Sequence, residues 1–252
     1  MDTAAHIDLL REHSERFAAL LVEATDGGRL GTTVPTCPDW SVRDLAEHLG
    51  GVGRWAAHLV EQGVDVETWR ASVPVTYPGE SDADVAPWFA AGIGPMTAAF
   101  AAAPPDRRVW GWGADQHARF WPRRVLHETL IHGADLALTL GHEPEIPAEA
   151  AVDGIDEFLT NLPLTARWGM PLDWFRGDGE RLVVRASDTG DTWRIRFHRT
   201  GMWWDRGADP ADATLAGPVA DLYLRLQGRA RPTVVAEGDD ALVDHWFTGL
   251  QF

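Results

Sequence analysis

Four segments whose apolar residues recur at helical spacing fill the first 142 positions of this chain. They cover residues 2–25, 41–59, 82–103 and 121–141. In each one apolar side chains return every three or four residues, which predicts an amphipathic helix. Ser41 and Asp44 have the form of a capping box, and Gly141 is suited to end the fourth helix. Because such helices bury their apolar faces against one another, this part of the chain predicts a four-helix bundle.

The remainder of the 252 residues has a different pattern. Residues 181–186 and 192–198 alternate polar and apolar side chains with period two, which predicts a β-hairpin. Further short strands are expected at 213–216 and 233–237, with helices at 148–161, 218–227 and 239–250. The chain exceeds the usual size of one domain. We therefore expect an α plus α+β protein, with a four-helix bundle over residues 1–146 and a small α+β domain over residues 147–252.

The fourth predicted helix carries Glu128, His132 and Asp135. At 100° per residue these positions fall within about 60° of one another, so they share one face. Apolar residues flank that face, and a carboxylate among apolar neighbours needs a partner. Glu128 and His132 are spaced so that their Cβ atoms lie about 5–6 Å apart, close enough for both side chains to bind one ion. Alone, the pair could also be an ordinary surface pair.

His48 is the candidate third ligand. It lies at the edge of the apolar stripe of the second predicted helix, where a histidine is often a core residue that hydrogen-bonds to the backbone. If the second and fourth helices pack antiparallel, His48 joins Glu128 and His132 in a set of two nitrogens and one carboxylate oxygen. Catalytic zinc sites use such sets and leave one position open. Asp135 either orients a ligand histidine from behind or is a solvated helix residue.

The composition limits partners and chemistry. A formal net charge of −16 argues against nucleic acid or an anionic membrane as partner. All basic residues are arginine, which excludes Schiff-base catalysis, covalent pyridoxal phosphate and a P-loop lysine. The single cysteine, Cys37, allows no cysteine-rich zinc site, so any metal must be held by histidine and carboxylate. Cys37 itself is expected to be a packed or neutral turn residue rather than a nucleophile.

The chain shows no sign of a membrane or export segment. No run approaches the roughly 20 apolar residues that a membrane span needs. The N-terminus has acidic residues and a helical period, where a signal peptide has basic residues and then an apolar stretch. We therefore expect a cytoplasmic protein, monomeric or homodimeric.

Two strings in the first half, TCPDWSVRDLAEHLGGVGRW and RRVLHETLIHGADLAL, resemble the signature regions of the mycothiol-dependent maleylpyruvate isomerase family. This family is a branch of the DinB-like metal-binding bundles. Two later strings, ATLAGPVADLYLRLQGR and VVAEGDDALVDHWF, are more weakly similar to the family's C-terminal domain, which is likened to sterol-carrier folds. The family's metal ligands then fall on His48, Glu128 and His132. Where the family often has His-Arg-Trp-Asp, this chain has His132-Gly133-Ala134-Asp135, a departure that bears more on the substrate than on the metal.

The resemblance implies a Zn2+ ion, or another divalent metal, whose open position binds the sulfur of a small thiol, mycothiol in the family. Coordination lowers the pKa of the thiol and holds a thiolate at neutral pH. The metal-bound thiolate then attacks a small electrophilic substrate. Addition, rotation and elimination would give cis–trans isomerisation, and displacement or simple addition would give S-transfer.

The contacts to such a thiol and to an acidic co-substrate are expected from aromatic residues beside arginines. Arg54, Trp55 and Trp40 are the candidates for binding the thiol, and Arg124 and Asp135 are the candidates for catalysis. Each arginine or tryptophan could instead be an ordinary surface or core residue.

Two other functions stay open. A hydrolase that uses zinc-bound water would need a general base near the metal, and Asp135 is the candidate for it. A ligand-binding or regulatory protein without activity would keep the fold and the metal.

Overall fold

The computed structural model describes residues 1–168, 176–208 and 210–248 and divides into two compact units. Unit 1 is Met1–Glu145 and unit 2 is Ile146–Phe252. Unit 1 is mainly helical, and unit 2 contains a five-stranded sheet with helices, so the expected fold class is confirmed. That each unit is a separately folding domain stays a prediction.

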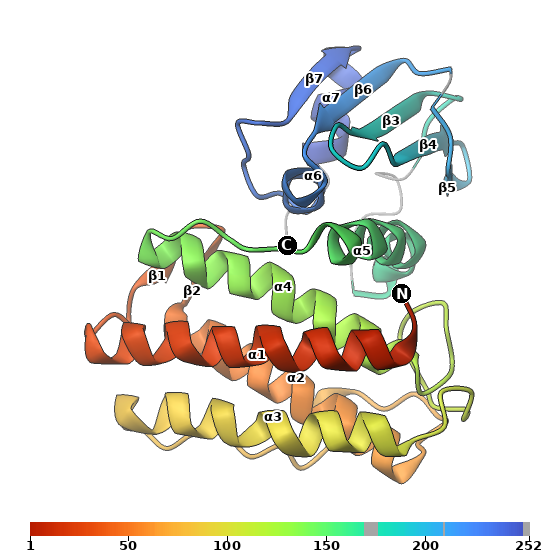
Figure 1. The fold of residues 1–252 in the computed structure, drawn as a ribbon. Helices are drawn as coiled ribbons and strands as arrows, with labels where there is room; N and C mark the ends of the chain where they lie inside the picture. The colour runs from red at the N-terminus through yellow and green to blue at the C-terminus, as the bar shows by residue number, and fades with distance from the viewer. Residues whose placement is uncertain (169–175, 209, 249–252) are drawn as a thin grey trace. The chain divides into compact units, whose positions relative to one another are not determined.

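Unit 1 is built from four long helices: α1 (Thr3–Asp26), α2 (Val42–Gln62), α3 (Val85–Ala102) and α4 (Phe120–Leu140). Helix α4 packs against α1 and α2, and α3 packs against the same two helices (Figure 1). The predicted caps are present. Ser41 and Asp44 form a capping box, and Gly141 ends α4 with a φ of 86°, which glycine adopts without strain. These caps fix the ends of the two helices that carry the candidate metal ligands.

The core of the bundle sets how α2 and α4 face each other. Leu45 on α2 is buried in the same cluster as Leu136 on α4. Further along, Trp55 packs edge-on against Trp121, with ring centroids 4.8 Å apart. Both placements indicate an antiparallel pair, because Leu45 and Trp121 lie near the starts of their helices while Trp55 and Leu136 lie further along. The antiparallel packing assumed for His48 is therefore present.

A short hairpin between α1 and α2 takes the place of the turn expected there. Strand β1 (Thr33–Val34) pairs antiparallel with β2 (Cys37–Ser41). The hairpin contacts both α2 and α4. It therefore brings Thr36, Cys37 and Trp40 to the end of α4.

One sequence-based expectation about membranes needs correction. Residues Asp82–Ala102, which include α3, are long and apolar enough to cross a membrane, with a mean hydropathy of 1.3. The bundle buries 44% of that stretch, including Phe89 and Phe100. Since a buried core helix passes the same test of length and composition, this stretch is weak evidence for a membrane.

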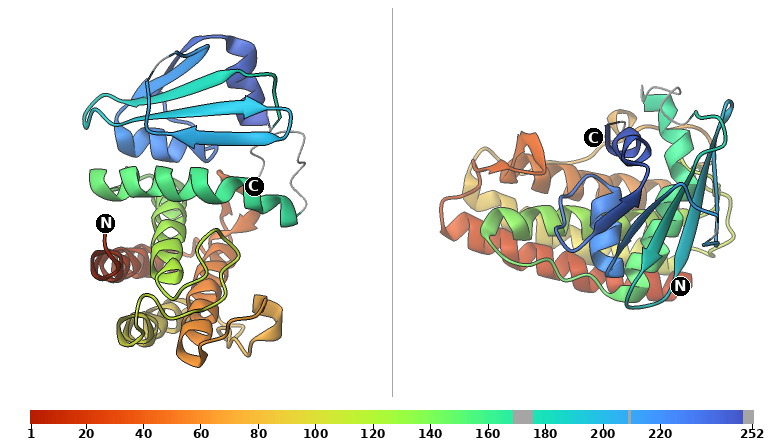
Figure 2. Two further views of the ribbon diagram at one scale, coloured as in Figure 1. Left: turned by 90° about the vertical axis from the view of Figure 1, so that its right-hand side faces the viewer. Right: turned by 90° about the horizontal axis from the view of Figure 1, so that it is seen from above.

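Unit 2 has one mixed sheet in the order β5-β4-β3-β6-β7, in which β3 and β6 are parallel and the other neighbours are antiparallel. Its elements are α5 (Ala148–Asn161), β3 (Arg181–Ala186), β4 (Thr192–His198), β5 (Gly201–Asp205), β6 (Ala213–Gly217), α6 (Val219–Leu226), β7 (Val235–Gly238) and α7 (Asp240–Thr248). Trp193, Ile195 and Phe197 alternate along β4 and are buried. Helices α6 and α7 lie on one face of the sheet (Figure 2), and Trp246 of α7 packs on Phe197. Strand β5 was not predicted, and residues 249–250 of the last expected helix lie outside the described residues.

Candidate metal centre

Three predicted ligands, His48, Glu128 and His132, meet between α2 and α4. His132 Nε2 lies 3.2 Å from Glu128 Oε2, and His48 Nε2 lies 3.5 Å from the same oxygen. One ligand atom of each residue lies within 4.8 Å of the others. Bonds of about 2.0–2.1 Å around a tetrahedral zinc ion place neighbouring ligand atoms roughly 3.3 Å apart. The donor types and their separations therefore fit a divalent metal such as zinc.

Asp135 supports His132 from the side away from Glu128. Its Oδ2 lies 3.0 Å from His132 Nδ1, and its Oδ1 accepts a hydrogen bond of 2.6 Å from the Thr36 hydroxyl. An ionised carboxylate can only accept, so the imidazole proton belongs on Nδ1 and the Nε2 lone pair points toward Glu128 and His48. Asp135 is 0% exposed, which rules out the alternative that it is a solvated helix residue.

Arg124 lies one helical turn before Glu128 and contacts it. Its guanidinium pairs with Glu128 Oε1, while Oε2 is the oxygen that faces both histidines. The guanidinium carbon also lies 5.3 Å from the ring centroid of Trp112, within cation–π distance. With its side chain 15% exposed, Arg124 holds Glu128 in place. It also supplies the positive charge that compensates the buried carboxylate.

The protonation states suit a metal ligand set. Burial lowers the pKa of His48, which favours the neutral imidazole that a metal requires. Burial alone would raise the pKa of Glu128, but Arg124, His132 and His48 outweigh it and hold this pKa well below its usual range. For His132, burial acts to lower the pKa, yet the hydrogen bonds with Asp135 and Glu128 outweigh burial and raise it. Without metal, the site therefore favours one extra proton on His132.

Of the residues predicted to bind the thiol, one lies at the ligand cluster. The Trp40 ring centroid lies 4.6 Å from that of His48 and 5.8 Å from that of His132. Trp40 therefore forms a wall beside both imidazoles. The hairpin that follows α1 places it there.

Arg54 and Trp55 are directed elsewhere. The Arg54 guanidinium donates to the carbonyl oxygens of Gly50 and Trp88 and lies 4.1 Å from the centroid of the Trp88 ring, toward α3. Trp55 is buried and donates to the carbonyl of Thr68. The structure does not bring these two residues to the cluster.

A second group of possible ligands in the described residues shares His132. It consists of Cys37, His132 and Asp135, with Cys37 Sγ 3.8 Å from Asp135 Oδ2. In this group His132 would have to use Nδ1, the nitrogen that Asp135 engages. The first group, in which both Nε2 atoms converge on one oxygen, is therefore the better candidate for a metal site.

Sequence reasoning missed three contributors to this site. Thr36 reaches Asp135 from the hairpin, Arg70 donates to the carbonyl of His48 over 3.3 Å, and Trp112 lies against Arg124. Nothing in the sequence pointed to Arg70. Trp112 belongs to the Trp-Gly-Trp-Gly run at 110–113, whose aromatic character was the available signal.

Comparison with known proteins shows the family of this chain. Residues 10–137, slightly more than half of the chain, match the family model described as the mycothiol maleylpyruvate isomerase N-terminal domain. The chain belongs to this family. The matched segment of this family member contains the hairpin and all of the residues that form the candidate metal centre.

Solved structures resemble this family member over nearly its whole length. The mycothiol-dependent maleylpyruvate isomerase matches 94% of this chain and 93% of its own, with a TM-score of 0.65 at 15% identity. A histidine-to-alanine variant of that isomerase covers the same shares, with a TM-score of 0.66 at 14% identity. At such low identity these likenesses show the fold alone. No curated protein matches the chain.

Proposed function

We propose that this protein is a zinc-dependent enzyme that activates a small thiol, mycothiol or a close relative, for addition to a small electrophilic substrate. Cis–trans isomerisation is the outcome that the family suggests, and S-transfer is the other product of the same chemistry. The main support for this proposal is that His48, Glu128 and His132 converge in a chain of this family. The name of the solved relatives supports the choice of thiol and reaction.

The residues present fit the metal that the proposal needs. A bound zinc ion would lower the pKa of a thiol that reached it, so that the nucleophilic thiolate exists at neutral pH. His48 offers a neutral Nε2, His132 offers its Nε2 once a metal has displaced the proton there, and Glu128 offers one ionised oxygen. Three protein ligands match catalytic zinc sites, which keep a position open, better than structural sites, which use four.

Arg124 and Asp135 act through the ligands in this proposal and are positioning residues. Arg124 occupies Glu128 Oε1 and so leaves Oε2 for the metal. Asp135 fixes the tautomer of His132. As a general base for a hydrolase Asp135 is poorly suited, because it is fully buried and already accepts hydrogen bonds from Thr36 and His132. Trp40 offers an aromatic wall for the body of the thiol.

The test is thiol consumption. Zinc-loaded protein is mixed with mycothiol and a small activated alkene, and free thiol and alkene geometry are followed together. We expect turnover that requires zinc and thiol, with the thiol regenerated during isomerisation and consumed during S-transfer. Alkene turnover that needs zinc but no thiol would indicate that zinc-bound water reacts instead. Zinc-loaded protein that turns over neither alkene nor thiol would contradict the proposal.

Variants of Asp135 and Thr36 test whether the hydrogen bonds from Thr36 to Asp135 and from His132 to Asp135 contribute to zinc binding. Asp135→Asn is expected to weaken zinc binding by about 10- to 100-fold, the usual cost of losing the carboxylate behind a ligand histidine. Thr36→Val, which keeps the shape of threonine but removes the hydroxyl that Asp135 accepts from, should weaken binding by less. Thr36→Ser should stay close to the parent. The measurement is competition for zinc against a chromophoric chelator, and equal affinities in the Val and Ser variants would remove Thr36 from the account.

A further inference from the structure

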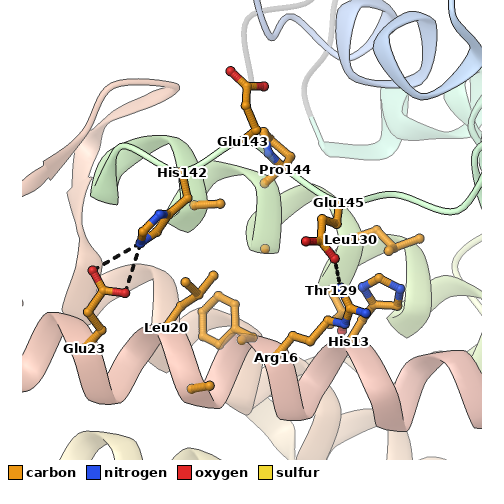
Figure 3. A pocket seen from close by; sticks show the side chains of 15 residues that line it. His13, Arg16, Leu20, Glu23, Thr129, Leu130, His142, Glu143, Pro144 and Glu145 are labelled. Carbon is orange, nitrogen blue, oxygen red and sulfur yellow. Dashed lines mark hydrogen bonds and ion pairs between the residues drawn. The ribbon is translucent and has the colours of Figure 1, made fainter.

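A cavity lies in unit 1, between α1, α4 and the segment 142–145 (Figure 3). Its volume is about 610 Å³. This falls within the range of roughly 300–1,000 Å³ typical of small-molecule sites. The segment 142–145 forms one wall and is tied to α1 by two ion pairs. His142 pairs with Glu23 at 3.0 Å, and Glu145 pairs with Arg16. The two pairs connect this segment to α1 at both ends.

The cavity is separate from the candidate metal centre. Its α4 lining includes Leu130, Gly133 and Ala137. At 100° per residue these lie about 140–200° around the helix from Glu128, whereas His132 lies about 40° from it. A ligand in the cavity would therefore contact the opposite face of α4. It would contact none of the three metal ligands.

The side chains of α1 and α4 that line the cavity are mostly apolar, and there is open space next to Gly133. Phe17, Leu20 and Leu130 supply the apolar surface, and small residues line the rest of α4. A Cβ atom added at Gly133 would meet nothing within 4 Å, so space stands open in front of that residue. An apolar body of moderate size therefore fits here.

The charges around the cavity favour a cation. Three glutamates, Glu23, Glu143 and Glu145, line it together with two basic side chains, Arg16 and His142, and Glu23 also pairs with Arg29 at 2.8 Å. Arg16 is engaged by Glu145 and by Glu12, the latter at 3.0 Å, so an anionic ligand would compete for Arg16 just as a cationic one would for Glu23 and Glu145. Glu12 adds a further carboxylate beside Arg16. The net charge of the chain, −16, adds to the attraction for cations.

His13 supplies a hydrogen-bonding group at the same place. It is 7% exposed and lines the cavity beside Arg16 (Figure 3). Its Nε2 is buried and has no hydrogen-bond partner in the described part of the structure. Burial and the neighbouring Arg16 lower the pKa of His13, which favours the neutral imidazole with one accepting nitrogen. An ammonium group is a donor that suits both this acceptor and the carboxylates.

We propose that this cavity binds a small amphipathic amine, with the apolar body on Phe17, Leu20 and Leu130 and the ammonium group among His13 and the glutamates. The inference is independent of the metal centre and of the proposed reaction. The amine is a ligand of the opposite face of α4.

The test compares three isosteric probes: 2-phenylethylamine, 2-phenylethanol and phenylacetate. Binding to the full chain is measured by titration with NMR detection. We expect the amine to bind at least fivefold more tightly than the alcohol and the carboxylate to bind most weakly. A double variant, Glu23→Gln with Glu145→Gln, should bring the amine and alcohol affinities together. Binding of phenylacetate as tight as that of the amine, or no detectable binding of the amine, would overturn the proposal.

Two glycine variants locate the site. Gly133→Leu should fill the open space and raise the dissociation constant of the amine at least tenfold. Gly94→Leu is the matched control, because Gly94 also lies in a helix with nothing within 4 Å of an added Cβ, but on α3 outside the cavity. Amine binding should be the same with zinc present or chelated. Equal amine affinity in the Gly133 variant and the parent would place the binding elsewhere and contradict the inference, whatever the fate of the thiol chemistry.

Discussion

Replacing His132 with alanine is expected to remove most of the metal from the purified protein. We predict close to one zinc per chain in the parent and a small fraction of that in His132→Ala. His132 is one of the three proposed ligands, and its loss also leaves Asp135 buried without the imidazole that it fixes. A partly assembled site of one histidine and one carboxylate should bind zinc far more weakly. The measurement is metal content by mass spectrometry after dialysis against metal-free buffer.

The control for this variant is a histidine outside the cluster. His117, which pairs with Asp115 at 2.6 Å, is 38% exposed in its side chain, and His117→Ala should keep its zinc. Because alanine leaves a cavity at a buried position, His132→Gln is a second variant that preserves more volume. Circular dichroism shows whether each variant is folded. Unchanged metal in a folded His132 variant would remove Glu128 and His132 from the site.

Acidification is expected to weaken zinc binding through His132. The pKa of this residue is raised above 6.5 in the metal-free protein because Asp135 and Glu128 outweigh the effect of burial. Zinc must displace the proton on Nε2, so below this raised pKa the affinity should fall by about tenfold for each unit of pH. His48, whose pKa burial lowers, is already neutral and should add little. Glu128, whose pKa is well below its usual range, stays ionised.

The raised pKa of His132 affects the stability of the metal-free protein in the opposite direction: acidification weakens zinc binding but favours the folded state. A group whose pKa is raised on folding stabilises the fold at low pH and loses that contribution as pH rises through the folded value. The His132 contribution should therefore be present below pH 6.5 without metal and decline above it. Chelator competition and urea unfolding between pH 5.5 and 7.5 measure the two effects. A zinc affinity that stays constant over this interval would contradict the assignment.

The helical spacing of residues along α4 was the most informative signal for the site in the sequence. Glu128, His132 and Asp135 share a face because of their spacing along α4, and this is a local property. His48 needed an assumption about packing, which the contact of Trp55 with Trp121 now supports. Thr36 could not be found in this way. It lies 99 residues from Asp135 in the chain and reaches it through a hairpin that has no periodic signal.

The position of Arg54 shows why a residue that is close to His48 in the sequence need not lie at the site. It lies six residues after His48 on α2, which is about 240° around the helix, so it points toward α3. Trp55 returns to the face of His48 but about 10 Å further along the axis, where it joins the aromatic core. In the same way, the apolar composition of α3 does not separate a bundle helix from a membrane span, because burial is a tertiary property.

X-ray absorption at the zinc edge tests most directly whether this centre receives a thiol. The spectrum of the zinc-loaded protein alone should be described by nitrogen and oxygen neighbours only, from His48, Glu128 and His132 with solvent. After mycothiol is added, we predict one sulfur neighbour at about 2.3 Å, the distance of a zinc–thiolate bond. A first shell that remains nitrogen and oxygen at saturating thiol would contradict the account.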